Sequence, residues 1–313
     1  MLSMKALLLA VLLSFSLSGP AACDAQKRGN VGSSNQTGKT GAAGNSQPDG
    51  SRTDNAKGDL KTLAEGQHSS VTNAFIFTAR DVETYNALRK LVTNLPEQSA
   101  EFFKSNQVVA AFLGERRTGG YSVRFTLPAN RTLRVSESAP PKDSMTTQAI
   151  TYPFAVVSVP VSQEQALTLE LGSVWNDMTR AYQVTGGEFT MSGGIMGRSE
   201  KFGVTGSIYV MREGGLATFL FSLGNSGGGK PRLLREVVTG VVGADGRVSI
   251  ASMSAGSFVD PPADALKATG QFTENEGKLS LTFESIPGQI ADGFNGRGTL
   301  NASATGPAPA KNR

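Results

Sequence analysis

The sequence predicts a mainly β protein in which a small α+β module is followed by an antiparallel meander of about eight strands, a closed or half-open barrel. One observation is the composition, which has 18% charged residues and 37 glycines among 313 residues, together with many Thr, Val and Ser. A second is that strand patterns recur every 8 to 14 residues beyond residue 180, with turn-forming residues between them. The length is that of roughly two domains.

The first 22 residues are expected to be a signal peptide. Lys5 supplies a positive charge, an apolar run from Ala6 to Leu17 follows, and small residues precede Cys23. A membrane-spanning helix needs about 20 apolar residues, and this run is shorter. Export from the cytoplasm is the expectation that follows.

Cys23 is the expected lipid attachment site. Ala21-Ala22-Cys23 resembles a lipobox, although Pro20 stands where that pattern usually has Leu. The resemblance implies a lipid-anchored protein of the bacterial cell envelope that faces the periplasm or the exterior. The alternative is an ordinary cysteine beside a conventional cleavage site, for instance after Ala21. A single cysteine forms no internal disulfide.

Residues 23–70 are expected to form a disordered tether. The stretch from Asp24 to Ser70 is rich in Gly, Ser, Asn and Thr and contains no Phe, Trp or Tyr. Such a segment buries too little apolar surface to offset the entropy of ordering it.

Residues 71–162 are expected to form the α+β module. Asp81 is a helix N-cap candidate, with Tyr85 and Leu88 on one face of the helix that follows, and Pro96 opens a shorter helix through Phe103. The expected strands are residues 74–77, 107–113, 121–127, 131–136, 147–151 and 154–159.

Part of this module resembles the PrcB C-terminal domain family. The resemblance is carried by a strand that ends at Gly114, then Thr118-Gly119-Gly120-Tyr121, then Thr151-Tyr152-Pro153 before a Val-rich strand. The family is named for a lipoprotein subunit of a spirochaete surface protease complex. The resemblance implies an exported, often lipidated and non-catalytic partner protein, with a protease as a partner.

The same residues form a candidate interaction loop. Glycines let a partner backbone approach closely, and tyrosine suits interfaces because it joins an apolar ring to a polar tip. The alternative is a plain turn in which glycines adopt positive φ. The candidate residues are Arg116, Arg117, Thr118, Gly119, Gly120, Tyr121 and Tyr152.

Residues 163–180 are expected to connect the modules, residues 181–304 to form the antiparallel β domain, and residues 305–313 to be a flexible tail. The side chains on the inward face of this domain form either an ordinary hydrophobic core or a pocket for a small apolar ligand. The expected strands are Tyr182–Thr190, Phe202–Met211, Leu216–Leu223, Leu233–Val242, Arg247–Met253, Leu266–Thr273, Leu279–Phe283 and Gly298–Ala302.

The sequence offers poor material for catalysis. The only histidine, His68, lies in the expected tether, so no histidine-based relay or metal site is expected. A formal net charge of +4 is too weak for a nucleic-acid surface. We therefore expect no catalytic residues, metal or cofactor. The leading hypothesis is a tethered interaction protein. The alternatives are a carrier of a small apolar ligand in the C-terminal β domain and an enzyme that uses carboxylates.

Overall fold

A computed structural model describes most of the chain beyond residue 59. The described residues are 60–128, 132–161, 165–193, 198–226, 233–254, 266–273, 275–286 and 295–307. All of them belong to one compact unit. The predicted signal peptide, Cys23 and the tether up to residue 59 lie outside the described residues.

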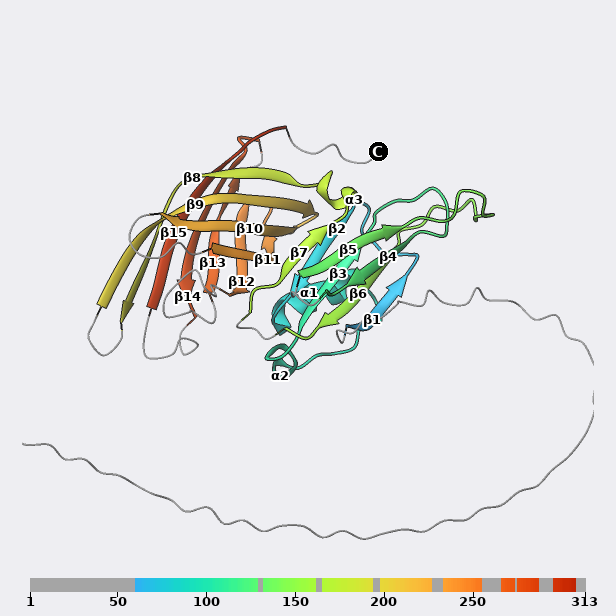
Figure 1. Ribbon diagram of the computed structural model, residues 1–313, viewed down its shortest axis with the longest axis horizontal. Coiled ribbons are helices and arrows are strands. Elements are labelled where there is room, and N and C mark those ends of the chain that lie inside the picture. Colours follow the sequence, from blue (N-terminus) through green and yellow to red (C-terminus); the bar gives the residue numbers. More distant parts are fainter. Residues whose placement is uncertain are drawn as a thin grey trace, which may run out of the picture. The chain divides into compact units, whose positions relative to one another are not determined.

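The α+β module contains two sheets (Figure 1). An antiparallel sheet has the order β1-β6-β3-β2, and a smaller one has the order β4-β5-β7 with β5 and β7 parallel. Their bounds are β1 Lys61–Gly66, β2 Phe75–Ala79, β3 Gln107–Phe112, β4 Ser122–Thr126, β5 Thr132–Ser138, β6 Phe154–Val159 and β7 Thr168–Leu171. The helices are α1 Val82–Leu91, α2 Ala100–Phe103 and α3 Ser173–Asn176.

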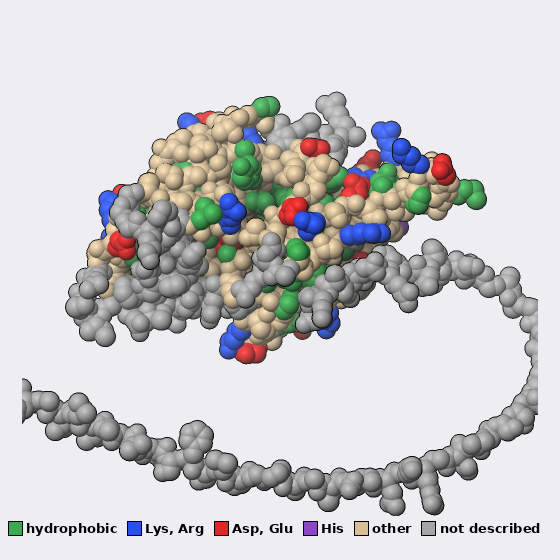
Figure 2. Space-filling model, in the orientation of Figure 1, with side chains coloured by type: hydrophobic (Ala, Val, Ile, Leu, Met, Phe, Trp, Pro, Cys, Tyr) green, Lys and Arg blue, Asp and Glu red, His purple; other side chains and the backbone are tan. Residues whose placement is uncertain are grey.

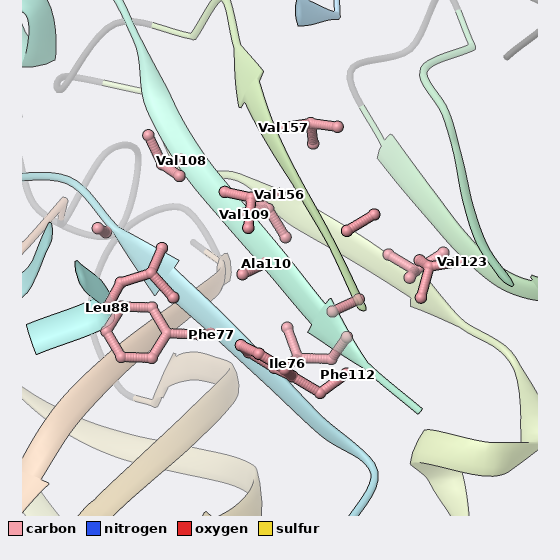
Figure 3. Close-up of a cluster of buried hydrophobic side chains, with 14 of the residues drawn as sticks. Ile76, Phe77, Leu88, Val108, Val109, Ala110, Phe112, Val123, Val156 and Val157 are labelled. Carbon is pink, nitrogen blue, oxygen red and sulfur yellow. The ribbon is translucent and has the colours of Figure 1, made fainter. Parts of the chain in front are cut away.

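The module core is built from the continuous apolar strands. Every residue of β2 and β3 is buried, and Figure 3 shows Ile76, Phe77 and Val109 together with Leu88 of α1. Helix α1 begins where the sequence predicted, because the Asp81 carboxylate accepts a hydrogen bond from the backbone N–H of Thr84 at 2.7 Å.

Three expectations about this module are wrong in detail. The predicted tether runs too far, because residues 61–66 form β1 and pair with β6. The second helix starts at Ala100 rather than at Pro96, since the Ser99 hydroxyl caps it by accepting from Phe102 N at 3.3 Å. Residues 147–151 form no strand; only Thr151 makes a bridge, with Arg116.

The expected connector 163–180 is also part of the α+β module. Its strand β7 joins β5, and the Trp175 indole is fully buried in the module core. The indole N–H donates to the Phe112 carbonyl at 3.0 Å. A buried tryptophan needs such an acceptor, which fixes this segment against β3.

The second module is a closed eight-stranded antiparallel barrel, as the sequence predicted, with the order β10-β11-β12-β13-β14-β15-β8-β9. Buried and exposed residues alternate along its strands, for example throughout β14. The bounds are β8 Arg180–Gly193, β9 Arg198–Glu213, β10 Leu216–Ser226, β11 Leu233–Val242, β12 Arg247–Met253, β13 Leu266–Thr273, β14 Lys278–Ser285 and β15 Asn295–Ala304. The predicted tail begins later than residue 305, because Thr305 N donates to Ala181 O at 3.0 Å. Residues 308–313 lie outside the described residues.

Threonines on the outer wall of the barrel hydrogen-bond to the outer edge of β2. The backbone N–H of Thr78 donates to the Thr239 hydroxyl at 2.8 Å, and the Thr218 hydroxyl donates to the Ile76 carbonyl. An uncovered strand edge is a template for unwanted pairing. The barrel therefore protects this edge of the four-stranded sheet.

A buried ion pair lies at the same contact. Strand β11 pairs with β12 only at its last two residues, and Arg80 reaches Glu236 of β11 in the part that β12 does not cover. The Arg80 side chain is 2% exposed and that of Glu236 is fully buried. The Glu236 carboxylate also accepts from Ser254 N at 3.0 Å.

Candidate functional site

Two loops of the α+β module bring the predicted interaction residues together. One loop follows β3 (residues 114–121) and the other precedes β6 (residues 139–152); we call them the paired loops. Because β3 and β6 pair antiparallel, with Phe112 opposite Phe154, the chain leaves one strand beside the place where it enters the other. This topology places Tyr152 beside the Thr-Gly-Gly-Tyr segment.

Hydrogen bonds join the two loops to each other. Arg116 and Thr151 exchange two backbone hydrogen bonds of 2.8 Å. Gly119 N donates to Thr147 O at 3.0 Å, and the Thr151 hydroxyl donates to Thr118 O at 3.1 Å. The loops are therefore held in one shape before any partner arrives.

The Arg116 side chain links the first of the paired loops to strand β5. Its guanidinium forms an ion pair with Glu137 at 2.9 Å, donates to the carbonyls of Leu113 and Glu115 at 2.9 Å, and lies 5.5 Å from the centre of the Tyr121 ring. A planar guanidinium with several donors suits this cross-linking task. Arg116 thus organises the first of these loops from within.

The two tyrosines are linked through Gln67, which follows β1. The Gln67 side chain donates to Tyr121 O at 3.0 Å, and its carbonyl accepts from Tyr152 N at 2.7 Å. The Tyr152 hydroxyl lies 3.4 Å from a carboxylate oxygen of Glu115. Gln67 was assigned to the tether by the sequence, since nothing local signals its distant partners.

Gly120 adopts φ of +89°, whereas Gly119 has no positive φ, so the positive φ expected of the glycines in a plain turn holds for Gly120 only. A Cβ atom there would lie 2.9 Å from Cβ of Pro140 in the other loop. Both the backbone angle and the close approach require glycine.

The outward face of the paired loops carries apolar side chains that the sequence reasoning missed. Met145 is 104% exposed and Ile150 is 57% exposed, and Arg117 is also exposed. Figure 2 shows hydrophobic and charged side chains near one another at this end of the module. The available signal was two large apolar residues within a stretch of Pro, Lys, Asp, Ser and Thr.

The described part of the chain has neither a cluster of metal-binding side chains nor a helix suited to spanning a membrane. It contains no group of three or more His, Cys, Asp or Glu side chains placed to hold a metal ion. Among the same residues, no helix has the length and apolar character needed to cross a membrane. His68 is exposed and lies just after β1.

The most perturbed carboxyl group lies away from the paired loops. Burial raises the pKa of Glu236 to about 7, against the opposing effects of the Arg80 charge and the hydrogen bond from Ser254 N. Through its ion pair with Arg80, Glu236 belongs to the contact between the α+β module and the barrel.

Apolar side chains of the barrel strands, including those of Tyr182, Phe219 and Leu281, form one buried cluster on the inward face. A hollow of about 560 Å³ lies at one end, where three hairpin turns meet near Gly214, Gly243 and Phe272. A closed barrel of eight strands is just wide enough for such side chains.

Residues 107–160 match the sequence model of a family described as PrcB C-terminal. The matched segment runs from β3 to the end of β6 and includes both paired loops. The comparison with curated proteins finds no match, and the comparison with solved structures finds none.

Proposed function

We propose that this protein is an exported, lipid-anchored interaction protein without catalytic activity. It serves as an accessory subunit of an envelope or surface protease complex and binds its partner through the paired loops. Cys23 carries the lipid, and the tether lets the folded body reach its partner away from the membrane.

The observation that carries this proposal is that the paired loops, which are hydrogen-bonded to each other, carry two exposed large apolar residues, Met145 and Ile150, and the exposed Arg117. Interfaces draw most of their affinity from a few large side chains surrounded by polar ones. Because hydrogen bonds already order the loops, binding loses less conformational entropy than it would with mobile loops. The family match supports a protein partner, since it covers these loops.

The test is purification of the full chain from its own membranes in mild detergent, with mass spectrometry of the proteins that accompany it. The double variant Met145→Ser, Ile150→Ser is expected to lower the amount of co-purified protease subunit at least tenfold. Val241→Ser, at an exposed apolar position on the barrel, is the matched control and is expected to retain it. Melting curves of both variants verify that the fold is unchanged.

The proposal is contradicted if the double variant retains every accompanying protein at the yield of the unaltered chain. A small bound molecule without any polypeptide, seen by native mass spectrometry, would instead favour the carrier function.

A further inference from the structure

A groove lies between strand β7 and the outer wall of the barrel. It consists of two hollows of about 380 and 260 Å³, which share Leu169, Tyr209 and Leu220. Leu171 and Asn176 line the first hollow only, and Ser222 and Arg235 line the second only. We call this feature the β7 groove; its long axis follows β7.

On the edge of β7 that faces away from β5, one residue has neither its backbone N–H nor its C=O hydrogen-bonded to a described residue. Gly172 N donates to Val135 O, so even-numbered residues point their backbone groups toward β5 and odd-numbered ones point away. On the outward edge, Leu167 O accepts from Val237 N and Leu171 O accepts from the Asn176 side chain, both at 3.2 Å.

Between these two satisfied carbonyls, the N–H and C=O of Leu169 have no hydrogen bond to any described residue. Leu169 lines both hollows, and the carbonyls of the outward residues on either side of it, Leu167 and Leu171, already accept hydrogen bonds. The N–H and C=O of Leu169 are the pair that one residue of an added strand would satisfy.

The walls of the groove define the chemistry of such a strand. Leu220 and Tyr209 offer apolar surface, and the Tyr209 side chain is 42% exposed on a barrel wall. Arg235 is exposed and lines only the hollow that contains Thr168, so positive charge lies at that end. A strand rises about 3.3 Å per residue, so the stretch from Leu167 to Leu171 matches roughly four residues.

The tether of this chain does not fit that description. Between Asp24 and Asp59 it contains no Leu, Ile, Met, Phe, Tyr or Trp. A lipid chain would fill apolar space but has no donor and acceptor for Leu169. A segment of another polypeptide satisfies the hydrogen bonds, the apolar walls and the charge together.

We propose that the β7 groove binds an extended, apolar polypeptide segment of about four residues, added as a strand to β7, with a carboxylate beside Arg235. This site is separate from the paired loops, so it stands or fails independently of the function proposed above.

The test is selection of random heptapeptides displayed on phage against the purified full chain, followed by fluorescence polarisation with the enriched peptides. We expect alternating apolar residues and an Asp, Glu or free C-terminus at one end. Tyr209→Glu and Arg235→Glu are expected to weaken binding at least tenfold. Val241→Glu on the same barrel and Met145→Ser on the paired loops are expected to leave binding unchanged.

N-methylation of each peptide residue in turn separates strand addition from simple apolar contact. Methylation at one internal residue is expected to weaken binding about tenfold, because it removes the N–H that the Leu169 carbonyl accepts. The proposal is overturned if no peptide is enriched, or if enriched peptides bind Tyr209→Glu and Arg235→Glu as tightly as the unaltered chain. Displacement by oleate together with indifference to N-methylation would identify a lipid site and would also overturn it.

Discussion

At the scale of single residues, the paired loops depend on side chains that are distant in sequence. Arg116, Glu137 and Gln67 come from three separate segments, and each makes contacts that fix the loops. The sequence identified Arg116 through its place in a turn, but its partner Glu137 and the bridging Gln67 carry no local signal. Gln67 is brought to the loops by the pairing of β1 with β6, and Glu137 lies on β5 of the other sheet.

Gly120→Val is expected to lower the free energy of unfolding by about 1–3 kcal/mol. The reason is the φ of +89° at Gly120 and the 2.9 Å approach of Pro140. Gly186→Val is the matched control, because a Cβ atom there meets nothing within 4 Å. Urea denaturation measures both; equal stability of the two variants would remove the requirement for glycine at position 120.

Glu236 is expected to make stability fall as pH rises. Its pKa is about 7 in the folded protein against 4.5 as its ordinary value, so the folded state holds more protons between these two pH values. The unfolding free energy therefore decreases across that window, by at most about 3 kcal/mol.

The measurement is the unfolding free energy of the unaltered chain and of Glu236→Gln, each at pH 5 and at pH 8. Subtracting the value of the variant from that of the unaltered chain at each pH cancels the contributions of other titrating groups. This difference is expected to be smaller at pH 8. A difference that does not fall between pH 5 and pH 8 would mean that Arg80 holds the carboxyl group ionised throughout.

At the scale of elements, strands with strong alternation were predictable and strands that depend on a distant partner were not. The bounds of β11, β12 and β13 match those expected, because apolar and polar residues alternate between clear turns such as Asp245-Gly246. Strand β1 was missed, since most of its residues are exposed or half-buried and its order comes from pairing with β6. The predicted strand at 147–151 failed because its backbone bonds go to the loop at 116–119.

Thr218→Val is expected to destabilise the protein by about 1–3 kcal/mol, because it leaves the buried Ile76 carbonyl without its hydroxyl donor. Valine has nearly the same shape, so packing is preserved. Thr269→Val, at an exposed barrel position, is the control and is expected to change stability by no more than about 0.5 kcal/mol. Equal melting temperatures for the two variants would show that the barrel does not stabilise the β2 edge.

At the scale of the whole molecule, the folded body combines an α+β module that carries the paired loops with a β-barrel, and threonine hydroxyls and one buried ion pair join the two. The barrel was predictable from strand count and spacing. Its contact with β2 was not, because Thr218 and Thr239 look like ordinary outward residues of an alternating strand.

Cys23→Ser is expected to abolish incorporation of radiolabelled palmitate and to release the protein from the membrane fraction. The reason is the position of Cys23 after an apolar run and two alanines, where a lipid is added in proteins with a lipobox. One acyl chain binds membranes only weakly and several bind firmly, so loss of the attachment residue removes anchoring altogether. Palmitate that still enters the variant would place the lipid elsewhere.

The most direct test of the central claim is site-specific photo-crosslinking in living cells. A photoreactive phenylalanine derivative replaces Met145 in the full chain, and a second version carries it at Lys104, an exposed residue directly after α2. Irradiation is expected to link position 145 to one dominant polypeptide, identified by mass spectrometry as part of a protease complex, whereas position 104 is expected to give no such adduct. No adduct from position 145, or the same adducts from both positions, would contradict the account.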